Sequence, residues 1–215
     1  MAKKIKSYSE AQLIDMFALV RLVGKNKLPL LDEWLEAQTT LSAAENELFE
    51  QIYQEAVQDI DGWQEEDLKM KFICFVLRLG NLRDSPKFKT YFEKTIETTI
   101  DGIFLKTKTD FMVAKGILDM PQVPFFHFQE WKKQRDPNGD PMAQLLEAFL
   151  IAQNKNKSEK AVYGCTITGK YWEFVIMEGK KYCISKSFDC TQKEDLLKII
   201  AVLRKFKEIL ETKLL

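Results

Sequence analysis

One stretch of the chain, residues 123–133, most constrains the fold, because it begins as an apolar run of strand length and ends in charge. A run that is apolar on both faces predicts a central strand covered by helices on both sides, as in α/β proteins. Side chains alternate along a strand, so Glu130 and Lys132 point to the same face. Charges are rarely placed at the end of a buried strand without a reason, which makes this pair the first candidate for function.

Composition adds mainly exclusions. The 32 basic residues balance the 32 acidic ones, so no overall basicity favours nucleic-acid binding, although a local basic patch would suffice for it. No apolar run approaches the roughly 20 residues of a membrane span, and the first residues lack the apolar core of a signal peptide. The four cysteines show no C-x-x-C spacing. We therefore expect a cytoplasmic protein with reduced cysteines and no membrane association.

The spacing of apolar residues predicts helices in the first part of the chain. The expected helices span residues 7–23, 30–37, 42–60 and 63–79. In the last of these an inward stripe of Leu68, Phe72, Phe75, Val76 and Leu79 follows an acidic first turn. We expect residues 1–60 to form a helical extension packed on a single domain of residues 61–215.

Strands dominate the later part. Residues 88–99 suit either a strand or a helix, and two adjacent strands are expected to be joined by a polar turn near residues 106–108. The central strand covers 123–132, and Pro141 starts a helix. Strands at 162–168, 171–177 and 181–184 precede a closing helix over 191–215. This order predicts an α/β protein with a mixed central sheet flanked by helices.

The available chemistry is carboxylate chemistry. The single histidine, His127, falls on the strand face opposite Glu130 and is interpreted as structural, and no P-loop, dinucleotide fingerprint or nucleophile elbow is present. Asp110 lies in an otherwise apolar strand, and Glu130 ends the next one. Two carboxylates at neighbouring strand ends suit Mg²⁺, and Lys132 could stabilise charge on a phosphate. The alternative is a solvated strand end with a Glu–Lys ion pair.

The pattern of Asp110, about twenty residues, then Glu130-Trp131-Lys132 resembles the D…D/E-x-K signature of the PD-(D/E)XK nuclease superfamily. The family order is a helix, a hairpin carrying the Asp, a strand ending in the signature, a crossover helix and another strand. The resemblance covers roughly residues 63–185, including Asp140-Pro141 at the start of the crossover helix, and leaves 1–60 unexplained. Thr109 stands where the family has a proline. The resemblance implies the restriction-endonuclease-like fold.

The resemblance also implies site residues and a function. Asp110, Glu130 and Lys132 would be catalytic, and Asp110, Glu130 and Glu65 would hold Mg²⁺ or Mn²⁺, with Glu65 preferred because it lies over the buried stripe. Glu66 and Gln144 are possible supporting residues of the site. The candidate nucleic-acid contacts are Lys106, Lys108, Lys133 and Arg135. The implied function is a Mg²⁺-dependent nuclease that hydrolyses phosphodiester bonds, with DNA favoured over RNA.

Two alternatives stay open. The first is a catalytically inactive member of the superfamily that serves as an interaction or regulatory module. The second is a homodimer formed through residues 1–60, in which Trp34, Leu30 and Leu31 are expected to be exposed.

Overall fold

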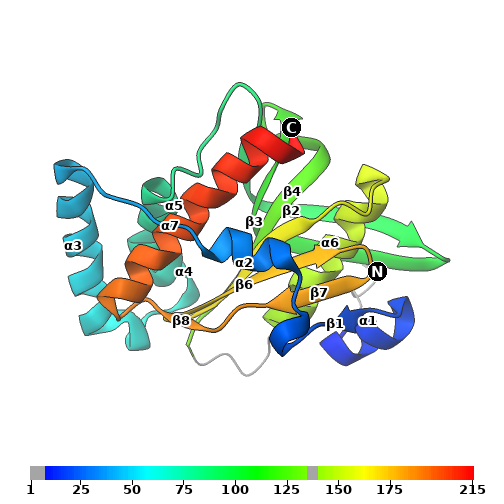
Figure 1. Ribbon diagram of the computed structural model, residues 1–215, viewed down its shortest axis with the longest axis horizontal. Helices are drawn as coiled ribbons and strands as arrows, with labels where there is room; N and C mark the ends of the chain where they lie inside the picture. The colour runs from blue at the N-terminus through cyan, green and yellow to red at the C-terminus, as the bar shows by residue number, and fades with distance from the viewer. Residues whose placement is uncertain (1–7, 135–139) are drawn as a thin grey trace, which may run out of the picture.

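A mixed β-sheet forms the centre of the protein in the computed structural model, which describes residues 8–134 and 140–215 (Figure 1). Arg135, a candidate nucleic-acid contact, lies outside the described residues. The strands run in the order β1-β7-β6-β5-β4-β3-β2, with β8 paired to β6. Only β4–β5 and β1–β7 are parallel among the described pairs. The strands are β1 (Val20–Arg21), β2 (Lys89–Ile100), β3 (Ile103–Ile117), β4 (Met120–Lys132), β5 (Val162–Thr168), β6 (Tyr171–Glu178), β7 (Lys181–Ile184) and β8 (Phe188–Asp189).

Helices cover both faces of this sheet, so the expected α/β class with a mixed, helix-flanked sheet is confirmed. One face packs on α6 (Pro141–Asn156) and α1 (Glu10–Phe17). The other packs on α2 (Pro29–Leu35), α3 (Ala43–Asp59), α4 (Glu65–Leu68), α5 (Cys74–Leu79) and α7 (Lys193–Ile209). Figure 1 shows α7 lying across its face of the sheet. In the described part of the chain, no helix is long and apolar enough to cross a membrane.

The central strand β4 is buried on both sides, as its apolar run predicts. Phe126 and Trp131 enter the core under α7, whereas Phe125 and Phe128 enter the core under α6. The crossover helix α6 then returns the chain to β5, which pairs with β4 in parallel, as expected. Its start is fixed by Asp140, whose carboxylate accepts the Ala143 N–H at 2.9 Å.

The β2–β3 hairpin confirms one expectation and corrects another. Two adjacent strands are present, and residues 88–99, for which a helix was the alternative, lie in a strand, but the turn near residues 106–108 was wrong. The chain turns at Asp101–Gly102, where both residues have positive φ (49° and 80°). An Asp-Gly pair adopts that conformation at little cost, so it makes the tighter turn. Lys106 and Lys108 therefore lie within β3.

The amino-terminal segment also departs from the prediction. The expected helix over residues 7–23 ends at Phe17, because Ala18 takes a left-handed conformation (φ 52°) and the chain then joins the sheet edge as β1 beside β7.

The helical region 63–79 is confirmed, although Phe75, expected to face inward, is 37% exposed. A π-helical turn at Lys69–Ile73 shifts the facing of the residues that follow it.

Trp34 is buried, which contradicts the exposed surface expected for a dimer. Its indole N–H donates to the Val202 carbonyl of α7 at 2.8 Å, and its ring contacts Tyr163 and Phe174 of the sheet. Leu31 beside it is fully buried too. The segment containing α2 thus contributes to the main core, because a large aromatic side chain with one polar atom is most stable where that atom finds a partner.

This burial makes a prediction about stability. Replacing Trp34 by Ala should lower the free energy of unfolding by about 3–5 kcal/mol, since it leaves a large cavity and removes a buried hydrogen bond to the Val202 carbonyl. Chemical denaturation measures the loss. The matched control is Val57→Ala on α3, where the side chain is 48% exposed and a change within about 0.5 kcal/mol is expected. Equal effects of the two substitutions would show that α2 is not part of the cooperative core.

Candidate active site

The candidate site lies where β3 and β4 separate. The two strands are paired as far as Phe111 opposite Gln129. Beyond that pair β4 continues along β5 to Lys132 and β3 continues along β2, so the next residues, Asp110 and Glu130, flank the opening. The strand spacing predicted this proximity correctly, because residues at equal distance from a paired position stay close across a ladder.

A hydrogen bond from the backbone holds Asp110 in place. The Trp131 N–H, which has no β3 carbonyl opposite it, donates to Asp110 Oδ2 at 2.7 Å. Both groups are buried. A buried N–H without a partner is costly, so this bond stabilises the separation of the strands and fixes the direction of the carboxylate at the same time.

A network behind Trp131 supports it from the α7 side of the sheet. The indole N–H of Trp131 donates to Gln129 Oε1 at 3.0 Å, and the Gln129 amide nitrogen lies 3.1 Å from His127 Nε2. All three residues are buried, and burial lowers the pKa of His127 to about 3. His127 is therefore neutral, on the opposite face from Glu130, and acts in packing.

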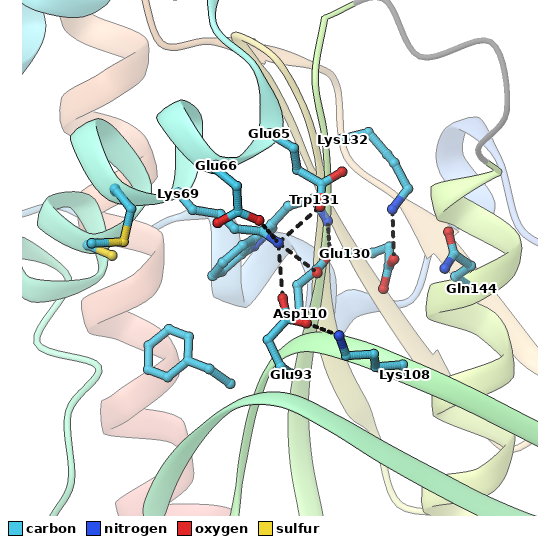
Figure 2. A pocket seen from close by; sticks show the side chains of 13 residues that line it. Glu65, Glu66, Lys69, Glu93, Lys108, Asp110, Glu130, Trp131, Lys132 and Gln144 are labelled. Carbon is cyan, nitrogen blue, oxygen red and sulfur yellow. Dashed lines mark hydrogen bonds and ion pairs between the residues drawn. The ribbon is translucent and has the colours of Figure 1, made fainter.

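Helix α4 and the π-helical turn that follows it bring more charged side chains to the gap between β3 and β4. Glu65 and Lys69, one turn apart, form an ion pair of 2.9 Å. The Lys69 ammonium also lies 3.0 Å from Glu93 and 3.5 Å from Asp110, and Figure 2 shows it at the centre of these carboxylates. Lys69 begins the π-helical turn, a local widening that is frequent at functional sites.

Glu130 and Lys132 form the second part of the site. Their side chains project from the same face of β4 and meet at 3.2 Å, with the Glu130 side chain 4% exposed and the Lys132 side chain 14% exposed. Gln144 reaches toward them from α6 (Figure 2). A single cavity of about 690 Å³ is lined by all of these groups.

Burial controls the electrostatics of the two carboxylates. It raises the pKa of Asp110, against the opposing effects of the Trp131 N–H and of Lys132 and Lys69. Burial, together with repulsion from Asp110, raises the pKa of Glu130 to about 8 despite the ion pair with Lys132. Near neutral pH the two carboxylates therefore share less than two full negative charges, and a cation between them would favour the fully ionised pair.

Lys132 stays charged. Burial acts to lower its pKa, but attraction by Glu130 and Asp110 outweighs this, and the pKa is raised overall. A lysine in that state is a poor proton acceptor near neutral pH. Its chemistry is to stabilise negative charge and to orient a polar ligand by hydrogen bonding.

The remaining predicted residues divide into two groups. Glu66 and Lys108 line the cavity; the Glu66 side chain is 81% exposed and Lys108 forms an ion pair with Glu93. Lys106 and Lys133 do not line it among the described residues. Lys106 pairs with Glu97 at 2.6 Å, and Lys133 donates to Gln64 at 3.1 Å.

Two charged residues of the site, Lys69 and Glu93, were missed from the sequence. The i, i+4 spacing of Glu65 and Lys69 is an available signal, because such pairs meet on a helix. Glu93 had no clear signal, since its segment suited either helix or strand. Its φ of 57° is unusual for a residue with a side chain, and backbone strain of this kind concentrates at functional sites.

The described side chains do not already form a group of three or more His, Cys, Asp or Glu arranged to hold a metal ion. Asp110 and Glu130 instead face different ammonium groups, Lys69 and Lys132. The donor set itself consists of hard carboxylate oxygens, the ligands that Mg²⁺ prefers, so it fits that ion once Lys69 turns aside. No model of a known protein family matches the chain, and no curated protein matches its sequence.

The raised pKa of Glu130 predicts how stability depends on pH. A carboxyl whose pKa is about 8 when folded and 4.5 when unfolded keeps its proton in the folded state, so stability falls as pH rises from about 4.5 to about 8. Glu130→Gln should remove up to about 1.4 kcal/mol of this loss per pH unit and make the protein more stable at pH 8. Thermal or chemical unfolding across this range provides the measurement.

Asp67→Asn is the matched control. Hydrogen bonds to Lys71 and Gln64 lower the pKa of Asp67, so its contribution is lost below the unfolded value rather than above it. The control should leave the slope between pH 5 and 8 as in the wild type. If the stability of the wild type and that of Glu130→Gln depend on pH in the same way, the pKa of Glu130 is not raised in the folded protein.

Proposed function

We propose that the protein is a Mg²⁺-dependent nuclease with a restriction-endonuclease-like fold, related to the PD-(D/E)XK superfamily. The observation that carries the proposal is the convergence of Asp110, Glu130 and Lys132 where two buried strands separate. The strand order supports it as well, because a hairpin with the Asp precedes a strand ending in Glu-x-Lys and a parallel crossover follows.

Each residue has a role in hydrolysis of a phosphodiester. Asp110 and Glu130, with Glu65 from the preceding helix, would hold Mg²⁺, or Mn²⁺ in its place. The ion supplies Lewis-acid stabilisation of the charge that develops on the phosphate. Lys132, charged near neutral pH, positions the attacking water and stabilises negative charge in the transition state. The Trp131 N–H keeps Asp110 directed into the cavity throughout. DNA is the favoured substrate over RNA.

One observation favours a second function, a non-catalytic module. The Lys69 ammonium already pairs with Glu65, Glu93 and Asp110 and offsets part of their negative charge, which is how a fold that has lost its metal would partly balance the remaining carboxylates. A protein of this kind would bind nucleic acid or a protein partner without turnover. A measurement of metal binding distinguishes the two proposed functions, because only the nuclease needs a metal ion at this site.

The nuclease proposal predicts loss of activity in specific variants. Glu130→Ala and Lys132→Ala should each reduce Mg²⁺-dependent cleavage of labelled DNA by about 100-fold or more, because each removes a group that acts in the transition state. The matched control is Lys205→Ala on α7, which removes a lysine that pairs with Glu208 outside the cavity and should cleave at nearly the wild-type rate. If Glu130→Ala and Lys132→Ala cleave as fast as the wild type, this site does not catalyse the cleavage.

The metal proposal predicts a separate effect of Lys69. Without metal, Lys69→Met should destabilise the protein by about 3 kcal/mol, since it removes the ion pair of the buried Asp110 carboxylate. Mg²⁺ should then restore stability and bind about tenfold more tightly than to the wild type, because a competing ammonium is gone. Calorimetry and thermal shift measure both quantities independently of activity.

Lys71→Met on the same helix is the control for this experiment. Its ammonium pairs with Asp67 and is half exposed, so it should change neither metal affinity nor metal-induced stability. If Mg²⁺ stabilises neither the wild type nor Lys69→Met, the site holds no metal and the non-catalytic function is favoured.

A further inference from the structure

The cavity at the candidate site has two walls of different chemistry. Asp110, Glu130 and Lys132 belong to its charged wall. Its apolar wall is made by four other side chains: Met70, Cys74, Phe92 and Trp131. Two of these are well exposed, Met70 at 66% and Phe92 at 48%. Apolar surface left open beside a charged site is typical of ligand pockets.

The apolar wall is the exposed side of a cluster of three aromatic rings. Phe92 packs edge-on against Phe111, with ring centroids 5.2 Å apart, and both rings contact Trp131, at 6.3 Å and 6.4 Å. Phe111 and Trp131 are buried, whereas Phe92 is half exposed and lines the cavity. The two buried rings restrain Phe92, so the cluster presents one positioned aromatic ring, which reduces the ordering cost of binding a flat group against it.

The aromatic cluster and the carboxylates come from neighbouring positions on the same three strands. Each strand places an acidic residue next to an aromatic one, in the pairs Phe92–Glu93, Asp110–Phe111 and Glu130–Trp131. The Lys69 ammonium spans the two walls, 5.9 Å from the Trp131 ring centroid and 3.5 Å from Asp110. With a metal ion at the carboxylates, as in the proposed function, a ligand that fills the cavity would carry a flat apolar group close to an anionic group such as a phosphate.

We propose that Phe92 and Met70 form a stacking site for one unpaired nucleobase of the strand whose phosphodiester lies at Asp110, Glu130 and Lys132. The inference rests on the proposed function and narrows its substrate to single-stranded or locally unpaired nucleic acid. Bases of an intact duplex are stacked on one another and cannot reach the ring. Stacking on an aromatic side chain tolerates every base, so the site selects for unpaired structure rather than for sequence.

Binding of a dye-labelled single-stranded oligonucleotide by the full chain tests the proposal, with Ca²⁺ in place of Mg²⁺ to avoid turnover. Fluorescence anisotropy should show that Phe92→Ala binds the single strand about 5- to 100-fold more weakly than the wild type. Phe92→Tyr keeps the ring and should keep the affinity. The matched control is Phe104→Ala, a phenylalanine of the same hairpin that is 55% exposed, lies outside the cavity, and should bind as the wild type does.

A second measurement locates the base. Oligonucleotides with one abasic residue at successive positions should bind the wild type more weakly at one position only, and Phe92→Ala should lose that dependence. If Phe92→Ala and Phe104→Ala bind alike, or if no abasic position matters, the stacking site is overturned. A fully paired duplex of the same sequence should bind wild type and Phe92→Ala equally; a duplex that depends on Phe92 also overturns it.

These outcomes are separable from the proposed nuclease function. Cleavage that needs Glu130 and Lys132 but is indifferent to Phe92 leaves the nuclease intact and removes the stacking site. Absence of cleavage with any divalent cation, together with binding that depends on Phe92 and on one base, removes the nuclease and supports the stacking site. If Phe92→Ala does not fold, the abasic series on the wild type and the Phe92→Tyr variant decide the question.

Discussion

The hydrogen bond from the Trp131 backbone to Asp110 is the interaction on which the site depends. It allows β3 and β4 to separate without leaving a buried N–H unpaired, and the separation makes room for the cavity. The same bond directs one carboxylate inward, while continued pairing of β4 with β5 keeps Glu130 and Lys132 on a rigid strand. A single contact thus links the geometry of the sheet to the placement of its charged groups.

Charge balance is the second constraint. The opening gathers several carboxylates in a place where burial disfavours their ionised form, and Lys69 and Lys132 offset only part of the repulsion. The raised pKa of Glu130 is the direct consequence. An arrangement of this kind lowers stability near neutral pH, which is common where a protein keeps groups poised for a ligand rather than optimised for folding.

The core between α7 and the sheet holds Trp131, and with it the candidate site, in position. Trp34 from α2 and Phe206 from α7 pack around His127, and His127 leads through Gln129 to the Trp131 indole. Residues far apart in the chain therefore hold the ring of Trp131 in place, and the backbone N–H of the same residue donates to Asp110. Aromatic packing is directional and dense, so it holds the central strand in one position.

The sequence by itself determined the α/β class, the central strand, the parallel crossover through α6, and the placement of Asp110 on the strand next to the one that carries Glu130 and Lys132. These follow from local patterns, since side-chain alternation, helix caps and proline placement act over a few residues. Only the tertiary structure decided the turn at Asp101–Gly102, the burial of Trp34, and the positions of Lys69 and Glu93 in the site. Turn geometry competes with neighbouring turn signals, and contacts between distant segments depend on how the elements pack, which no local pattern records.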